Sequence, residues 1–112
     1  MKDLALDCYM SCKNVLNPSK RRNSFEFFGF DFMIDEDFRV WLIEVNTNPY
    51  IGIHNQGMKH ILPEMLKSLF KIVLDPVFET NLTQNEIENP SEGTHFDLLY
   101  SRTKGIYKRR PV

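Results

Sequence analysis

The chain has 112 residues, of which 42% are hydrophobic and 26% charged, proportions typical of one small soluble globular domain. Its formal net charge of -1 gives no reason to expect nucleic acid as a partner. No apolar run approaches the ~20 residues that span a bilayer. The first residues also lack the apolar core and cleavage site of a signal peptide, so we expect an intracellular protein without a membrane partner.

Residues 2–16 are predicted to form a helix, because apolar side chains recur there at steps of three and four residues. Asn17-Pro18 ends the pattern. Cys8 and Cys12 lie on the apolar stripe, a spacing that favours two reduced core thiols over a disulfide. A metal pair is the alternative, although no nearby His or Cys completes a ligand set. The predicted stripe consists of Leu4, Ala5, Cys8, Cys12, Val15 and Leu16.

A β-hairpin is predicted next, with strands at 24–34 and 40–46 joined by the turn at 35–39. Alternation places one aromatic and aliphatic layer on a single face of the hairpin, and polar side chains on the other face. A turn of four residues, 36–39, sets Asp35 opposite Val40 and Asp31 opposite Glu44. A turn of odd length without a bulge would separate the two acids. The predicted layer consists of Phe28, Phe30, Phe32, Ile34, Trp41, Ile43 and Val45.

Asp31, Glu44 and Asn46 are therefore expected to meet on the polar face of the hairpin. Two opposed carboxylates repel by up to ~1 kcal/mol in an exposed sheet, which favours a cation between them. Hard oxygen ligands suit Mg²⁺ or Mn²⁺, and the uncharged amide of Asn46 leaves net positive charge for a polyphosphate. The hypothesis is a Mg²⁺-nucleotide site. A strand edge with solvated polar residues is the alternative, and the pattern alone does not decide between them.

The rest of the chain predicts a turn-rich segment at 47–57 and a helix that starts at Pro63 and runs to about Leu74. Residues 79–95 are rich in Glu, Asn and Thr without Lys or Arg, and they predict an acidic flexible linker. Residues 96–100 predict a short strand, and the basic chain end is expected to fray. The predicted buried stripe of this helix consists of Met65, Leu66, Leu69, Ile72 and Val73.

Two basic runs and three histidines leave alternatives open. Lys20–Arg22 and Lys108–Arg110 are expected to be solvated surface, with docking to an acidic partner as the alternative. His54 and His60 favour a surface or capping role over that of a base or substrate contact, and His95 has no partner visible in the sequence. Thr47 and Asn48 are expected to satisfy backbone groups where the strand ends, with support of the metal ligands as the alternative.

F-E-F-F-G-F-D-F-M-I-D at 25–35, followed by W-L-I-E-V-N-T-N-P at 41–49, closely resembles the C-terminal part of the ATP-grasp domain in the tubulin-tyrosine ligase-like family. N-P-S-K-R-R-N, L-D-P-V-F and F-D-L-L-Y extend the resemblance over most of the chain. It implies an α+β fold of helix, antiparallel hairpin, helix and short terminal strand. Residues 1–78 are expected to form the C-terminal lobe, 79–95 the linker, and 96–112 a terminal element with a basic tail.

The resemblance implies Asp31, Glu44 and Asn46 as ligands of Mg²⁺, or alternatively Mn²⁺, and places Ile43 against the adenine of ATP. No residue of this chain is expected to serve as nucleophile or base. The implied activity is an ATP-dependent ligase that joins glutamate, glycine or tyrosine to tubulin through an acyl phosphate. Tubulin and microtubules are then the partners, and the cytoplasm, cytoskeleton, and cilium or basal body are the expected locations.

An ATP-grasp enzyme also needs an N-terminal half with basic residues that grip ATP, and nothing in these 112 residues supplies them. The chain is therefore expected to be a C-terminal fragment that is inactive alone. The alternative function is a non-catalytic module, derived from such an enzyme, that binds tubulin or another partner through its basic segments.

Overall fold

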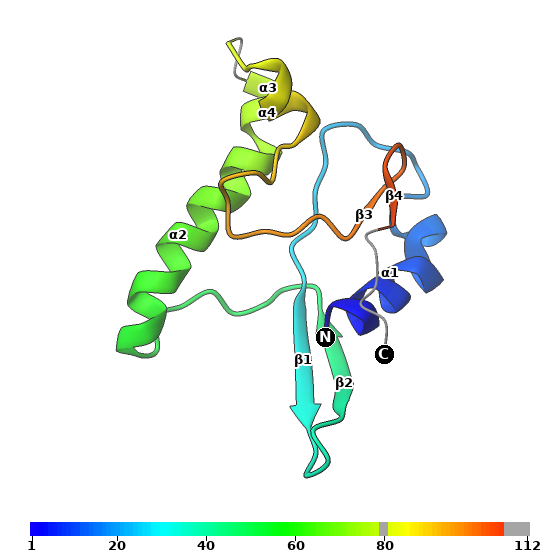
Figure 1. The fold of residues 1–112 in the computed structure, drawn as a ribbon, viewed down its shortest axis with the longest axis vertical. Helices are drawn as coiled ribbons and strands as arrows, with labels where there is room; N and C mark the ends of the chain where they lie inside the picture. The colour runs from blue at the N-terminus through cyan, green and yellow to red at the C-terminus, as the bar shows by residue number, and fades with distance from the viewer. Residues whose placement is uncertain (79–80, 107–112) are drawn as a thin grey trace. The chain divides into compact units, whose positions relative to one another are not determined.

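The computed structural model describes residues 1–78 and 81–106. The chain divides into two compact units: Met1–Tyr50 together with the chain from Leu99 onward, and Ile51–Leu98. Helices and an antiparallel hairpin occur together, which confirms the α+β class (Figure 1). The boundaries expected after residues 78 and 95 do not coincide with the limits of these units, and they remain a prediction about domain organisation.

Helix α1 spans Lys2–Leu16, as the apolar pattern predicts. Its buried face differs from the predicted stripe, since Leu6 is only 1% exposed whereas Val15 is 70% exposed. Tyr9 and Lys13 contact the chain end, since the Tyr9 and Tyr100 rings lie 5.5 Å apart and Lys13 Nζ lies 5.0 Å from the Tyr100 ring centre. Leu6, Tyr9 and Lys13 follow the three- and four-residue steps of one helix face.

The two cysteines of α1 are free and half-buried. The Cys12 thiol donates to the Cys8 carbonyl at 3.2 Å, which satisfies it within the helix. This agrees with the expectation of reduced thiols rather than a disulfide.

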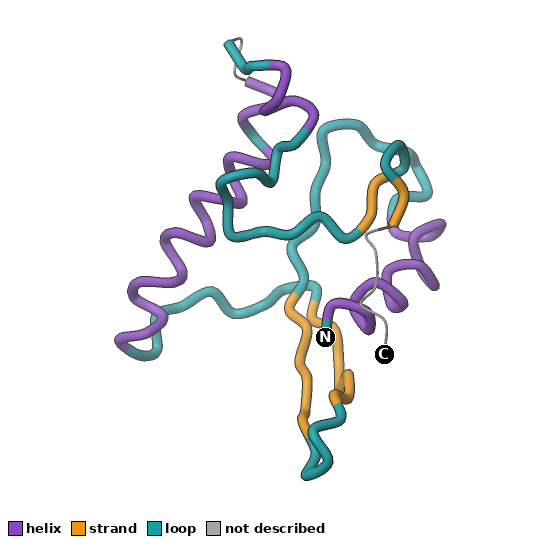
Figure 2. Tube along the Cα trace, in the orientation of Figure 1, coloured by secondary structure: helices purple, strands orange, loops and turns teal. Residues whose placement is uncertain are grey.

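The hairpin consists of β1, Gly29–Ile34, and β2, Val40–Asn46 (Figure 2). Residues 24–28 were predicted as strand but are irregular, because β2 ends at Asn46, which already pairs with Gly29. The predicted pairing of Asp35 with Val40 is wrong, since Ile34 pairs with Val40 and the Asp35 amide donates to the Arg39 carbonyl at 3.0 Å. The turn therefore has three residues, 36–38, of which Phe38 adopts a left-handed φ of 60°.

A β-bulge at Ile43 compensates for the odd turn. Leu42 pairs with Phe32 and Glu44 with Asp31, which leaves Ile43 as an extra residue of β2. The three-residue turn pairs Leu42 with Phe32 and so places Trp41 on the opposite face, and the bulge then restores the pairing of Glu44 with Asp31. The predicted placement of Trp41 and Ile43 in the apolar layer is thus wrong, and the two side chains are 56% and 58% exposed.

The apolar layer itself is made by other residues. The Phe30 and Phe32 rings stack with their centres 6.2 Å apart, and the side chains of Leu42 and Val45 are half-buried on the same face. The layer remains incompletely covered, because Ile34 on that face is 54% exposed.

The second unit contains α2, Gln56–Val73, followed by α3, Asp75–Phe78, and α4, Gln84–Glu88. Helix α2 begins well before Pro63, which corrects the predicted start. Asn55 caps this helix, since its side-chain oxygen accepts from the Met58 amide at 2.9 Å, and Pro63 lies in the helix interior. Part of the segment predicted as a linker is helical, because Thr83 and Glu86 form a reciprocal capping box at the start of α4.

The chain end returns to the first unit as a short strand pair, β3, Tyr100–Ser101, and β4, Gly105–Ile106. Only Tyr100 of the strand predicted at 96–100 is in β3. The basic run Lys108–Arg110 lies outside the described residues. None of the helices in the described part of the chain is long and apolar enough to cross a bilayer.

Candidate metal centre

Two carboxylates and one amide meet on the polar face of the hairpin. Strand β1 carries Asp31, and β2 carries Glu44 directly opposite it. The Asn46 side-chain nitrogen donates to Asp31 Oδ2 at 3.1 Å and to Glu44 Oε1 at 3.3 Å. The predicted gathering of these three side chains is confirmed, whereas their role as metal ligands remains a prediction.

The chemistry of this set fits a hard divalent cation. The partly positive amide group of Asn46 stands between two negative carboxylates, which is where a cation balances their charge. Half a rotation of the amide brings Asn46 Oδ1 in place of the nitrogen and makes the donor set all oxygen. Among residues 1–78 and 81–106, no three His, Cys, Asp or Glu side chains gather as metal ligands. Two carboxylates with an amide suit Mg²⁺ that keeps positions for water or phosphate oxygens.

Gly29 lies beside Asn46 at the end of the hairpin, where the chain after β2 passes closely. It pairs with Asn46, and a Cβ at this position would lie 2.9 Å from the Pro49 Cβ. Because real Cβ atoms essentially never come so close, the chain after β2 can cross here only over a glycine. The contact therefore holds Pro49, and with it the end of the strand that carries Asn46.

The bulge brings Ile43 out of the apolar layer. It directly precedes Glu44, and its side chain is 58% exposed. An exposed aliphatic side chain beside an acidic pair is available to a flat apolar ligand. Contact between Ile43 and adenine stays a prediction.

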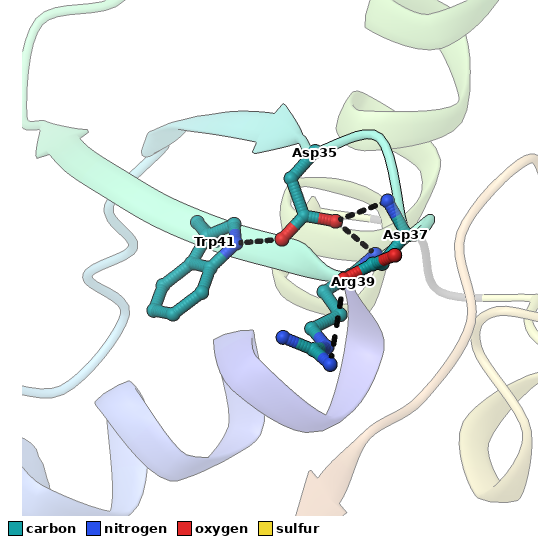
Figure 3. Close-up of polar contacts among 4 residues, drawn as sticks. All are labelled: Asp35, Asp37, Arg39 and Trp41. Carbon is teal, nitrogen blue, oxygen red and sulfur yellow. Dashed lines mark hydrogen bonds and ion pairs between the residues drawn. The ribbon is translucent and has the colours of Figure 1, made fainter.

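Asp35 organises the turn at the end of the hairpin (Figure 3). Its Oδ1 accepts from the amides of Asp37 and Arg39 at 3.0 and 2.8 Å. Its Oδ2 accepts from the Trp41 indole at 2.8 Å, and this bond, followed by that from the Arg39 amide, lowers the pKa of the Asp35 carboxyl. Asp37 also forms an exposed ion pair with Arg39 at 3.5 Å.

The Asp35–Trp41 bond was missed at the sequence level, because Trp41 was assigned to the apolar layer. The sequence D-E-D at 35–37 could have predicted the turn. An Asp side chain often accepts a hydrogen bond from the backbone amide two residues later and so closes a turn. The Asp35–Trp41 bond joins the residue that follows β1 to the second residue of β2, across the turn.

The remaining polar candidates are exposed. His54, His60 and His95 belong to the second unit, and the His95 amide donates to the buried Ser68 hydroxyl at 3.4 Å. Thr47 and Asn48, which follow Asn46, are exposed as well. The predicted surface role of His54 and His60 agrees with this exposure.

The fold and the site together define an α+β protein whose hairpin gathers two carboxylates and an amide. The family model described as "Tubulin-tyrosine ligase family" matches residues 2–82. The chain belongs to the tubulin-tyrosine ligase family.

Several curated proteins are similar to the chain. Tubulin glycylase 3D of Tetrahymena thermophila is 38% identical over 102 residues, which are 87% of this chain and 10% of that protein. Tubulin glycylase 3A of Drosophila melanogaster is 36% identical over 75 residues, 67% of this chain and 7% of that protein. The probable alpha-tubulin polyglutamylase Ttll1 of Tetrahymena thermophila is 24% identical over 113 residues, 91% of this chain and 27% of that protein.

The chain thus spans about a tenth of the two glycylases and about a quarter of the polyglutamylase. No solved structure matches the chain.

Proposed function

We propose that this chain supplies the metal- and nucleotide-binding hairpin of an ATP-dependent ligase that joins an amino acid to tubulin. The observation that carries the proposal is the convergence of Asp31 and Glu44 on the Asn46 amide, at 3.1 and 3.3 Å. Membership of the tubulin-tyrosine ligase family supports the reaction class, and the names of the similar glycylases and polyglutamylase support tubulin as the substrate. The ATP-grasp architecture is part of the same proposal.

The proposed reaction has two steps. The γ-phosphoryl group of ATP passes to a carboxylate oxygen of the acceptor, which gives an acyl phosphate and ADP. The amine of the incoming amino acid then attacks the acyl carbon, an amide bond forms, the C–O bond to phosphate breaks, and the amine loses a proton. Bound Mg²⁺ supplies charge neutralisation for the phosphoryl oxygens.

The residues of the chain position the reactants and carry no proton in this scheme. Asp31 and Glu44 hold the metal, and Asn46 adds an oxygen without further negative charge, so that phosphate remains attracted. Ile43 offers an exposed apolar surface to the base. These roles are the same whether the ligase joins glutamate, glycine or tyrosine. The proposed location is the cytoplasm, the cytoskeleton or the cilium.

Mn²⁺ titration with and without a non-hydrolysable ATP analogue tests the site, with the free ion read by electron paramagnetic resonance. Asp31→Asn and Glu44→Gln each remove one charged ligand and should weaken binding at least about tenfold. Glu36→Gln removes one exposed charge from the turn of the same hairpin and should leave binding within about twofold. Equal losses in all three variants, or no saturable Mn²⁺ binding by the chain, would contradict the proposal.

The isolated chain is expected to be inactive, because it spans only about a tenth of the similar glycylases and about a quarter of the similar polyglutamylase. Incubation with tubulin, ATP, Mg²⁺ and radiolabelled glutamate, glycine or tyrosine tests this. Measurable ligation by the chain alone would overturn it.

The second candidate function is a non-catalytic module that binds tubulin or another partner. Its support is the exposed basic run Lys20–Arg22, none of whose side chains forms an ion pair among the described residues. Binding to tubulin that is indifferent to Mg²⁺-nucleotide, and unchanged in Asp31→Asn, favours the module over the ligase.

A further inference from the structure

Ser24 lies in the segment that joins α1 to β1, and its sequence neighbours distinguish it from every other Ser and Thr of the chain. Residues 20–25 read K-R-R-N-S-F, so arginine stands three and two positions before the serine, and phenylalanine follows it. No other Ser or Thr of the 112 residues has arginine at both of these upstream positions. The segment therefore combines one hydroxyl with two guanidinium groups and an aromatic ring at a fixed spacing.

The segment around Ser24 is accessible to a modifying enzyme. Residues 17–28, all of which the structure describes, contain neither helix nor strand, and Figure 2 shows them as loop. Residues 20–25 are exposed, and the exposed fraction of the Phe25 side chain is 51%. A loop can be drawn into the extended conformation that an enzyme binds without the loss of a strand ladder or a helical turn.

Three side-chain hydrogen bonds hold the loop, and all three end on the backbone of Arg21. The Asn17 side-chain oxygen accepts from the Arg21 amide at 2.9 Å, and the Asn17 side-chain nitrogen donates to the Arg21 carbonyl at 3.0 Å. Ser24 Oγ donates to the same carbonyl at 3.2 Å. Because these bonds are exposed, water replaces them when they open, and the loop can rearrange around Ser24 at low cost.

The cations of the loop are available to an acidic enzyme surface. Lys20, Arg21 and Arg22 are exposed, and none of them forms an ion pair within the part of the chain that the structure describes. A guanidinium group binds a carboxylate with two parallel hydrogen bonds, so an enzyme can recognise the position of an arginine as well as its charge. Serine kinases that select basic substrates carry acidic residues in the substrate groove, and such a groove is complementary to this loop.

We propose that Ser24 is phosphorylated by a serine kinase that selects arginine three and two positions before its target and an apolar residue after it. Arg21 and Arg22 enter the acidic part of the kinase groove, and Phe25 covers its apolar part. Ser24 Oγ attacks the γ-phosphorus of the Mg²⁺-bound ATP that the kinase supplies, the bond to the β–γ bridging oxygen breaks, and ADP leaves. The hydroxyl proton passes to the catalytic base of the kinase.

Phosphorylation changes both the charge and the closure of the loop. A phosphoserine carries about −1.5 to −2 charges at pH 7, so the charge of residues 20–24 falls from the +3 of the three cations to about +1. The modified oxygen has no proton to donate to the Arg21 carbonyl, so that hydrogen bond is lost. The phosphate oxygens instead accept from the guanidinium groups of Arg21 and Arg22. The modification thus converts the basic run into a weakly charged loop that is paired within itself.

Incubation of the complete 112-residue chain with Mg²⁺-ATP and the catalytic subunit of the cyclic-AMP-dependent protein kinase tests the site. Mass spectrometry of the intact chain and of its fragments should show one phosphate, on Ser24. Ser24→Ala should abolish the incorporation. Ser19→Ala removes an exposed hydroxyl of the same loop that has no arginine before it, and this variant should be phosphorylated at the native rate.

The arginines have a matched control on α2. Arg21→Ala with Arg22→Ala should lower kcat/KM for phosphorylation about tenfold or more, because two bidentate contacts with the kinase are lost. Lys59→Ala with Lys67→Ala removes two exposed charges from α2 and should change kcat/KM less than about twofold. Equal losses in the two double variants would show that general charge, and not the spacing around Ser24, governs phosphorylation, and would overturn the inference.

A synthetic peptide of residues 17–28 tests whether the fold leaves Ser24 accessible. The complete chain should be phosphorylated as well as this peptide. Phosphorylation of the peptide without phosphorylation of the chain would show that the fold withholds the hydroxyl, and it would overturn the inference. Incorporation that persists in Ser24→Ala, or no incorporation into either substrate, overturns it as well.

The phosphorylated chain is then titrated by ³¹P NMR. Pairing with Arg21 and Arg22 should hold the second pKa of the phosphate below its ordinary value of about 6, and added salt should raise this pKa toward that value. An ordinary pKa at low salt would overturn the pairing. Asp31→Asn should be phosphorylated at the native rate, which separates this site from the proposed metal centre, and a lower rate would contradict that independence.

Discussion

Replacing Gly29 by alanine should strain the hairpin at its third polar position. The new Cβ would lie 2.9 Å from the Pro49 Cβ, against 3.4 Å for ordinary van der Waals contact, so about 0.5 Å of separation is missing. The opposing atom belongs to a proline ring, whose φ is locked, so the backbone must move. Overpacking of this kind costs about 1–3 kcal/mol. Because Asn46 pairs with Gly29, the movement also displaces the amide that joins the two carboxylates.

Urea denaturation followed by the emission of the single tryptophan, Trp41, measures the loss. Pro49→Gly removes the opposing Cβ. In that background, Gly29→Ala should lower the unfolding free energy by at least about 1 kcal/mol less than it does in the native chain. The Mn²⁺ affinity of Gly29→Ala should fall together with stability and recover in the double variant. A Gly29→Ala chain as stable as the native one, or equal costs in the two backgrounds, would refute this account of the crossing.

Two further predictions concern the turn. The pKa of Asp35 is lowered in the folded chain, chiefly by the Trp41 indole, so its stabilising effect is complete above the ordinary value of 3.8 and disappears as the pH falls through the lowered folded value. The stability difference between native chain and Asp35→Ala should accordingly shrink in acid, and a pH-independent difference would contradict it. Phe38→Gly should raise the unfolding free energy by up to ~1 kcal/mol, because Phe38 has a φ of 60° and is 87% exposed. Urea unfolding checks this, and a decrease would show that the Phe38 side chain packs in solution.

The pairing of Asp31 with Glu44 was predicted correctly, although the turn length and the regular ladder from which it was predicted are both wrong. We predicted the pairing from a turn of four residues and a ladder without a bulge. The chain instead combines a three-residue turn with an extra residue at Ile43, and the two departures cancel at Asp31. Alternation is a reliable guide to which residues share a face only until a bulge occurs. Glu44 and Asn46 lie beyond the bulge and keep the predicted pairing, whereas Trp41 lies between the turn and the bulge and is shifted by one position.

The helices show the same division. The apolar period predicted both ends of α1, yet its buried residue is Leu6, which the predicted stripe did not include. Pro63 predicted the start of the second long helix, but this helix begins earlier, at Gln56, where Asn55 caps it. The pairing of Thr83 with Glu86 is a capping signature that was readable in the sequence, where composition indicated a linker instead.

The amino-acid sequence by itself determined the α+β class, the identity of the three polar residues and the likeness to one ligase family, because these depend on residue type and short-range period. The tertiary structure decided the bulge and the orientation of Trp41 and Ile43. Those features depend on hydrogen bonds and contacts between residues distant in sequence, such as Asp31 with Asn46 and Gly29 with Pro49. No local pattern encodes such contacts, since each partner alone is compatible with several registers.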